Sequence, residues 1–312
     1  MGLKRIGWRH IEFDAPSDWD VVAEGQSGKT IFFRVSDRYR PRLEVNWERV
    51  PFEKAVKPRE MMEKYRDAWK RRLSKMEKRG FKAELKHMYK EDIEVYDHEG
   101  LLWAFRVGEE RLLAAFWYCE KSERAFTLIY TPERLDEEVG FFKRLLKSFK
   151  CHYREGEKAL WSLLLFNIYL PSDLRLVMAK FTAALSLAVF KEPDRPVYLL
   201  VGYSGLASMV MKSYKRGIRE WFDKTLKKEF GKIVKIPVPK PKYKELEDRA
   251  VFRGESFALP KSRRKVFTGE VWLNKDMNRV FGAAVLYELR YESEALELLE
   301  SVKHQLSTIR PS

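Results

Sequence analysis

The chain has 312 residues, of which 45% are hydrophobic and 34% are charged, and its formal net charge is +15. This length suits two globular domains, and the composition excludes a disordered or fibrous chain. Two cysteines are too few for a disulfide framework, and the N-terminus lacks the apolar run of a signal peptide, so we expect a cytoplasmic protein. Two Gln and four Asn against 61 Lys+Arg indicate a thermophilic source.

One stretch of the sequence occurs twice. Ile11–Trp19 returns as Phe166–Leu174, with Pro-Ser-Asp at the same place in both copies. Further on, Arg40-Pro41 falls on Arg195-Pro196 without a gap. A repeat of this length indicates tandem copies of one domain. We therefore predict a first repeat over residues 1–152 and a second over residues 153–312, with a hinge near residues 151–158.

The first repeat opens with short alternating runs separated by turns, which predict antiparallel strands. A helix with apolar residues at spacings of three and four then begins at Pro58 and ends at Gly80. More strand-like runs follow, and a closing helix begins at Pro132. The predicted strands cover residues 8–13, 19–23, 30–36, 42–50, 93–96, 101–107, 112–119 and 125–130.

The second repeat follows the same course. Its predicted strands begin with residues 163–170, 176–179, 185–190 and 197–201, and its closing helix covers residues 292–306. One long helix is expected between them, with apolar residues at Met211, Tyr214, Ile218, Phe222 and Leu226. The fold class is therefore α+β, each repeat being an antiparallel sheet with a long helix after the first strands and a closing C-terminal helix.

The opening of the first repeat has the pattern F-x-x-P-x-x-W, formed by Phe13, Pro16 and Trp19. With the later helix, this opening resembles the PsbP-like family. The resemblance implies a sheet flanked by helices and a binding or accessory subunit rather than an enzyme. The second copy has Leu174 in place of the Trp, and the chain lacks the export or lipoprotein signal of many members, so no functional residue is carried over.

The two repeats differ on one face of the predicted sheet. Five positions of the first repeat, four of them polar, all carry Leu or Val in the second, and a strand that is apolar on both faces must be covered on both. The first-repeat residues are Thr30, Phe32, Arg34, Glu44 and Asn46. We expect this face to pack against the first repeat or a second subunit. Charged residues interrupt the apolar runs well before the ~20 residues of a membrane span, so we predict none. The apolar positions are Leu185, Leu187, Val189, Leu199 and Val201.

Two sequence motifs suggest ligands, but their context favours ordinary structure. Ala23–Thr30 matches a relaxed phosphate-binding loop, but that loop requires a following helix, and here a strand follows. We therefore predict a hairpin turn. The acidic run Glu91–Glu99, which contains His98, alternates with Ile93 and Val95. This alternation predicts a strand with a solvated face rather than a cation site.

Candidate nucleophiles are equally weak. Cys151 and His152 are neighbours in sequence, but adjacency does not supply the geometry of a nucleophile and its base. Cys119 lies in an apolar strand, where we expect it to be core packing. We name no catalytic residue, no cofactor-binding residue and no metal ligand, and we expect no cofactor.

The clearest functional signal is the placement of positive charge. Residues 1–150 hold 32 basic against 27 acidic residues, whereas residues 212–265 alone hold 18 against 7. Basic residues on the long helices and in loops can contact phosphates without reading sequence. The alternative is a solvated surface in a charge-rich protein. The candidate anion-binding residues are Lys64, Arg71, Lys75, Lys78, Lys215, Arg216, Arg219, Lys227, Lys228, Lys240, Lys242, Arg263, Arg264 and Lys265.

We therefore expect a non-enzymatic binding protein with an anionic partner, RNA or DNA first. Two alternatives stay open. In one, the apolar sheet face of the second repeat binds another protein or a second copy. In the other, an enzyme has its site between the repeats, where ligand sites often lie.

Overall fold

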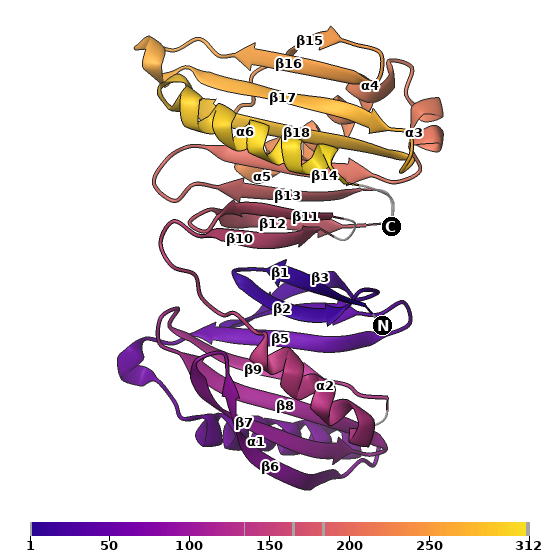
Figure 1. The fold of residues 1–312 in the computed structure, drawn as a ribbon, viewed down its shortest axis with the longest axis vertical. Helices are drawn as coiled ribbons and strands as arrows, with labels where there is room; N and C mark the ends of the chain where they lie inside the picture. The colour runs from indigo at the N-terminus through magenta and orange to yellow at the C-terminus, as the bar shows by residue number, and fades with distance from the viewer. Residues whose placement is uncertain (1, 134, 164–165, 183–184, 310–312) are drawn as a thin grey trace. The chain divides into compact units, whose positions relative to one another are not determined.

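The computed structural model describes residues 2–133, 135–163, 166–182 and 185–309. The chain divides into two compact units, Met1–Glu155 and Gly156–Ser312, and the division falls inside the segment expected as a hinge. Each unit contains one seven-stranded antiparallel sheet and one separate two-stranded hairpin (Figure 1). None of the helices among the described residues is both long and apolar enough to span a membrane.

In the first unit the sheet has the order β3-β4-β5-β9-β8-β7-β6, and β1 and β2 form the separate hairpin. Helix α1 (Pro58–Glu77) connects β5 to β6, and α2 (Leu135–Lys147) follows β9. The strands are β1 (Leu3–Trp8), β2 (Ile11–Pro16), β3 (Asp20–Ser27), β4 (Thr30–Ser36), β5 (Pro41–Arg49), β6 (Leu85–Val95), β7 (His98–Val107), β8 (Glu110–Cys119) and β9 (Arg124–Tyr130).

In the second unit the sheet has the order β12-β13-β14-β18-β17-β16-β15, with β10 and β11 as the hairpin. The strands are β10 (Lys158–Leu163), β11 (Phe166–Pro171), β12 (Arg175–Phe181), β13 (Ser186–Lys191), β14 (Tyr198–Ser204), β15 (Lys242–Glu245), β16 (Arg249–Glu255), β17 (Lys265–Asn274) and β18 (Arg279–Glu288). The helices are α3 (Ala207–Ser213), α4 (Gly217–Lys224), α5 (Leu226–Val234) and α6 (Glu292–Ser307). The two strand orders correspond one for one, so the predicted duplication is confirmed.

The units are richer in strand than the predicted α+β class implies. The strand expected over residues 8–13 is the β1–β2 hairpin, whose turn residues Arg9 and His10 have φ of 54° and 60°. The strand expected over residues 163–170 is likewise divided between β10 and β11, and residues 164 and 165 lie outside the described part. The motif at residues 23–30 forms the predicted β3–β4 hairpin, with Gly28 at φ 61°.

The long helix predicted for the second unit is wrong, because three short helices stand in its place. Tyr214 has extended backbone angles and ends α3, while Gly217 begins α4 with φ 57°. Thr225 then separates α4 from α5 with φ −115° and ψ −87°. These interruptions divide the segment, so that α4 packs on β16 and β17 while α5 packs on β13 and β14.

One face of each sheet is closed by its own hairpin and closing helix. In the first unit the Phe13 ring of β2 stacks on Phe33 of β4 and on Phe149 beyond α2, with centroid distances of 6.4 and 5.7 Å. In the second unit Trp161 of β10 packs edge-on against Phe190 of β13 at 4.8 Å. All five side chains are buried or nearly so, and the predicted closing helices are confirmed.

The opposite faces differ between the units, as the sequence predicted. In the first unit α1 packs over β6, β7 and β8, and Tyr65 contacts Phe105 and Phe116 there. In the second unit α4 and α5 pack on β13, β14, β16 and β17, and Leu187 and Val189 are 1% and 0% exposed beneath them. The expectation that this face needs a cover is confirmed. The expectation that the first repeat or a second subunit supplies it is wrong, because α4 and α5 do.

The pairing of β13 with β14 also corrects the sequence alignment of the repeats. Arg34 pairs with Glu44 in the first sheet, but Val189 pairs with Leu200 in the second. One extra residue between β13 and β14 therefore shifts the strand, and the counterpart of Glu44 is Leu200 rather than Leu199. Leu199 and Val201 consequently lie on the other face, which the β10–β11 hairpin and α6 cover.

Candidate functional sites

The four basic residues predicted on the first long helix are solvent-exposed on α1. In the part of the chain that the structure describes, no carboxylate lies within ion-pair distance of any of them. They are therefore free to contact an anionic partner. These residues are Lys64, Arg71, Lys75 and Lys78.

The basic residues on α4 and α5 are less available. Arg219 forms an ion pair with Glu245 at 3.2 Å and lies 4.6 Å over the Tyr243 ring. Lys227 is paired with Asp223 at 2.9 Å. Both cations are thus neutralised locally, as the solvated-surface alternative predicts. Lys215, Arg216 and Lys228 are exposed, and the Arg216 backbone N–H donates to Glu220.

The segment beyond these helices includes an edge strand, β15. Lys242 and Lys244 are exposed on β15, the last strand of the second sheet, and Lys240 precedes it. Between them, the Tyr243 hydroxyl donates to Asp223 at 2.9 Å. Tyr243 therefore packs inward, whereas both lysines face solvent. Charged side chains on an edge strand also prevent pairing with other chains.

A further group of basic residues lies in the loop between β16 and β17, which we call the basic loop (residues 256–264). Phe257 and Leu259 are 81% and 78% exposed there, and Lys261 and Arg263 are also exposed. The Arg264 guanidinium lies 5.8 Å from the Phe257 ring centroid, and its Nε has no hydrogen-bond partner among the described residues. Cations and an aromatic ring thus share one exposed loop.

The base of the basic loop is fixed by hydrogen bonds. The Ser256 N–H donates to the Lys265 carbonyl at 2.9 Å, and the Lys265 N–H donates to the Ser256 hydroxyl at 2.9 Å. The Leu289 N–H donates to the Arg264 carbonyl at 2.8 Å. The loop therefore presents Phe257 and its basic neighbours from a defined stem.

A groove of about 760 Å³ lies in the first unit between α1 and the uncovered strands β4, β5 and β9. Its helix wall contains Trp69 and Tyr65, and burial raises the pKa of Tyr65 to about 12. On the floor, Glu44 accepts from Arg34 Nε at 2.6 Å and from Asn46 Nδ2 at 3.1 Å. These three floor residues satisfy one another, and the exposed Lys64 of α1 lies on the opposite, helix side of the groove.

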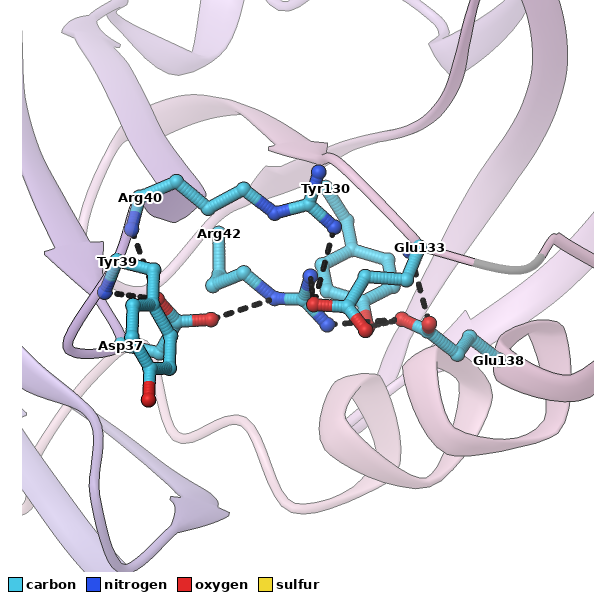
Figure 2. A network of polar contacts seen from close by, with 7 residues as sticks. All are labelled: Asp37, Tyr39, Arg40, Arg42, Tyr130, Glu133 and Glu138. Carbon is cyan, nitrogen blue, oxygen red and sulfur yellow. Dashed lines mark hydrogen bonds and ion pairs between the residues drawn. The ribbon is translucent and has the colours of Figure 1, made fainter.

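A buried polar network joins β5 to the closing helix of the first unit (Figure 2). Arg42, whose side chain is 9% exposed, contacts Glu133 at 3.0 Å, Glu138 at 3.2 Å and Asp37 at 3.6 Å. Tyr130 also donates to Glu138. Each carboxylate thus has a partner, and we assign the network a structural role.

One cluster of metal-ligating groups occurs among the described residues, although no sequence motif indicates it. The donor atoms of His98, Cys119, Cys151 and His152 all lie within 4.8 Å of one another. A hydrogen bond with Cys151 lowers the pKa of Cys119 to about 3 and raises that of Cys151. The acidic run around His98 forms the predicted strands β6 and β7, but its imidazole points to sulfur rather than to solvent.

Comparisons with known proteins return only weak likenesses. No protein-family model matches the chain, and no curated protein matches it. The solution structure of cyanobacterial PsbP from Synechocystis sp. PCC 6803 matches with a TM-score of 0.35 and 18% identity, covering 48% of this chain and 92% of that one. The predicted resemblance to the PsbP-like family is thus also found by structure.

A second likeness spans both units. The immunity protein TplEi of T6SS from Pseudomonas aeruginosa matches in its complex with the "L" peptide, with a TM-score of 0.31 and 11% identity over 98% of this chain and 97% of that one. Its apo structure matches with a TM-score of 0.32 and 10% identity. TM-scores this low give no information about the function of this chain.

Proposed function

We propose that this protein is a non-enzymatic binding protein that contacts single-stranded RNA or DNA through the basic loop of its second unit. The observation that carries the proposal is the exposure of Phe257 beside Lys261, Arg263 and Arg264 on one fixed loop. Single-stranded nucleic acids are bound by cationic side chains on the phosphates together with aromatic rings that stack on bases. Both elements are present here within nine residues.

The surroundings of the loop support the same partner. Lys265 adjoins the loop at the start of β17, and Lys240 and Lys242 extend the positive charge of this unit on the edge strand. No carboxylate lies within ion-pair distance of these lysines in the described ranges. An anionic membrane is the competing partner, but membrane affinity grows with the apolar area inserted. Phe257 and Leu259 offer only two side chains for insertion.

The covering of one sheet face supports the basic loop over the protein-partner alternative. That alternative relied on an apolar face of the second sheet, and α4 and α5 bury that face within the unit. The basic loop thus remains the better-supported surface.

The test is fluorescence anisotropy with a labelled single-stranded RNA and a labelled single-stranded DNA, from about 50 to 200 mM salt. Wild type is compared with a variant carrying Arg263→Glu, Arg264→Glu and Lys265→Glu. The matched control carries Lys54→Glu, Lys57→Glu and Lys82→Glu, which make the same change of charge at exposed positions of the first unit.

We expect wild type to bind with an affinity that falls steeply with salt. The loop variant should lose about 0.7 from the salt slope for each phosphate contact removed, and the control should keep the slope. Equal losses in both variants would show that net charge alone is responsible. Binding to anionic vesicles without binding to either nucleic acid would overturn the proposal.

A further inference from the structure

The cluster of His98, Cys119, Cys151 and His152 gathers residues from three parts of the first unit. His98 begins β7, Cys119 ends β8, and the last two residues follow α2. The segment after α2 is held in place because Lys150 and Glu12 exchange backbone hydrogen bonds of 2.7 and 2.9 Å. Both cysteines and two of the five histidines in the chain therefore meet at one end of the sheet.

The distances between donor atoms match the edges of a small tetrahedron. His98 Nε2 lies 3.2 Å from Cys151 Sγ, and His152 Nδ1 lies 3.4 Å from Cys119 Sγ and 3.5 Å from Cys151 Sγ. Zinc bonds of about 2.3 Å to sulfur and 2.0–2.1 Å to nitrogen give sulfur–nitrogen edges of about 3.6 Å in a tetrahedral site. No donor pair exceeds 4.8 Å, so small side-chain shifts suffice to close the site around an ion.

Burial identifies the class of site. Cys119 and Cys151 are fully buried, His152 is 8% exposed, and the His98 side chain is 10% exposed. Four protein ligands in a closed site are typical of structural zinc, whereas catalytic zinc keeps one position open. Two thiolates with two imidazoles also match the preference of zinc among the common divalent ions.

Neighbouring groups are placed to support bound sulfur. The Trp117 indole N–H faces Cys151 and the Ser122 hydroxyl faces Cys119. Neither group makes a hydrogen bond of normal geometry in the part of the chain described. Donors of this kind orient metal-bound thiolates and tune them. The buried Arg124 guanidinium donates to the Cys151 carbonyl and thereby fixes the segment that carries two of the ligands.

Asp97 contacts the same nitrogen of His98 that would bind metal, with 3.0 Å between Oδ1 and Nε2. Its other oxygen lies 3.2 Å from Lys121 Nζ. Asp97 therefore keeps a cationic partner when His98 Nε2 turns to a metal ion.

From this geometry we infer that the first unit holds one zinc ion, bound by His98 Nε2, Cys119 Sγ, Cys151 Sγ and His152 Nδ1. The ion joins β7 and β8 to the chain beyond α2, and its role is structural. A disulfide between Cys119 and Cys151 is the competing arrangement, but it gives no role to the two imidazoles that point at the sulfurs. The second unit has no equivalent, because Asn274 occupies the position of Cys119 when Trp272 is aligned with Trp117.

The test uses the full chain, purified under reducing conditions, stripped of metal and titrated with Co²⁺ as a spectroscopic probe and then with Zn²⁺. We expect one equivalent of Co²⁺ to bind with a thiolate charge-transfer band and the visible bands of tetrahedral cobalt, and Zn²⁺ to displace it. Zinc should also raise the midpoint of thermal unfolding of the stripped protein.

Cys119→Ser and Cys151→Ser should abolish the charge-transfer band or halve its intensity, and His98→Gln should weaken cobalt binding. His304→Ala, an exposed histidine of the second unit, is the matched control and should leave the spectrum unchanged. Circular dichroism identifies any variant that fails to fold. Either of two results overturns the inference. In the first, reduced wild-type protein takes up no cobalt. In the second, the purified protein contains a Cys119–Cys151 disulfide and, after its reduction, the thiols react freely with a thiol reagent in excess zinc.

Discussion

Arg42 of β5 donates a hydrogen bond of 3.2 Å to Glu138 of α2, so a buried guanidinium on the sheet is neutralised by the closing helix of its own unit. The same guanidinium contacts Asp37, whose side chain is only 10% exposed. It also lies 5.7 Å from the Trp19 ring. The closing helix is thus held to the sheet by charge as well as by apolar packing.

Replacement of Arg42 by Ala should destabilise the first unit by about 3 kcal/mol, because it removes the guanidinium that contacts the buried carboxylate of Asp37 and the carboxylate of Glu138. Arg40 is the matched control. It pairs with Glu133 at 3.2 Å, but both side chains are well exposed, so Arg40→Ala should cost less than about 1 kcal/mol. Differential scanning calorimetry measures both, and equal losses would contradict the structural role of Arg42.

Asp37 makes part of this stability depend on pH. Burial raises the pKa of its carboxyl, but hydrogen bonds from the Tyr39 and Arg40 N–H groups and the charge of Arg42 outweigh burial and hold the pKa below its usual value. A lowered folded-state pKa stabilises the protein above the unfolded-state pKa of about 3.9, and this stability is lost as pH falls through the folded-state pKa.

We therefore expect Asp37→Asn to lower the unfolding midpoint at pH 7, with a difference from wild type that shrinks below pH ~4. Thermal unfolding of both proteins between neutral and acidic pH checks this. A difference that stayed constant across that range would show that the charge of Asp37 contributes nothing.

Much of the architecture followed from the sequence because it depended on local patterns. The strand alternation and the helix that begins at Pro58 persist in the structure, and the 155-residue offset between the repeats holds for β10 to β13, β17 and β18. The division of the second helix did not follow, because apolar spacing continued through Tyr214 and Thr225 while their backbone angles interrupted the helix. The extra residue before β14 was also hidden, since one insertion in a turn leaves the apolar pattern of a doubly buried strand unchanged.

The Cys/His cluster could not be found by motif, because its ligands are distant in sequence except for one adjacent pair. The sequence feature that could have indicated the cluster was the small number of cysteines and histidines. A chain with two cysteines and five histidines has few such residues to place, and Cys151-His152 stands directly after the last core helix of its repeat. Only the antiparallel order of β7 and β8 brings His98 and Cys119 to the same end.

The packing of α5 on the second sheet requires Gly202. A Cβ at this position would lie 2.5 Å from Leu226 Cδ2 and 2.8 Å from the Ser186 carbonyl oxygen. Gly202→Ala should therefore destabilise the second unit by about 1–3 kcal/mol. Gly231→Ala in α5 is the control, since nothing lies within 4 Å of its new Cβ, and it should stabilise by about 0.5–1 kcal/mol. Chemical denaturation should show that the free energy of unfolding falls in Gly202→Ala and rises in Gly231→Ala. A Gly202→Ala protein as stable as wild type would contradict the close approach of α5.

The last prediction separates stacking from charge in the basic loop. Phe257 is 81% exposed, so Phe257→Ala should leave folding unchanged. If its ring stacks on a base, the substitution should weaken single-stranded RNA binding by about 5- to 150-fold, equivalent to about 1–3 kcal/mol, and leave the salt slope as in wild type. Phe52→Ala, at a 58% exposed position of the first unit, is the control and should bind normally. Anisotropy titrations at several salt concentrations decide the matter. A Phe257→Ala protein with wild-type affinity would show that the loop acts through its charges alone.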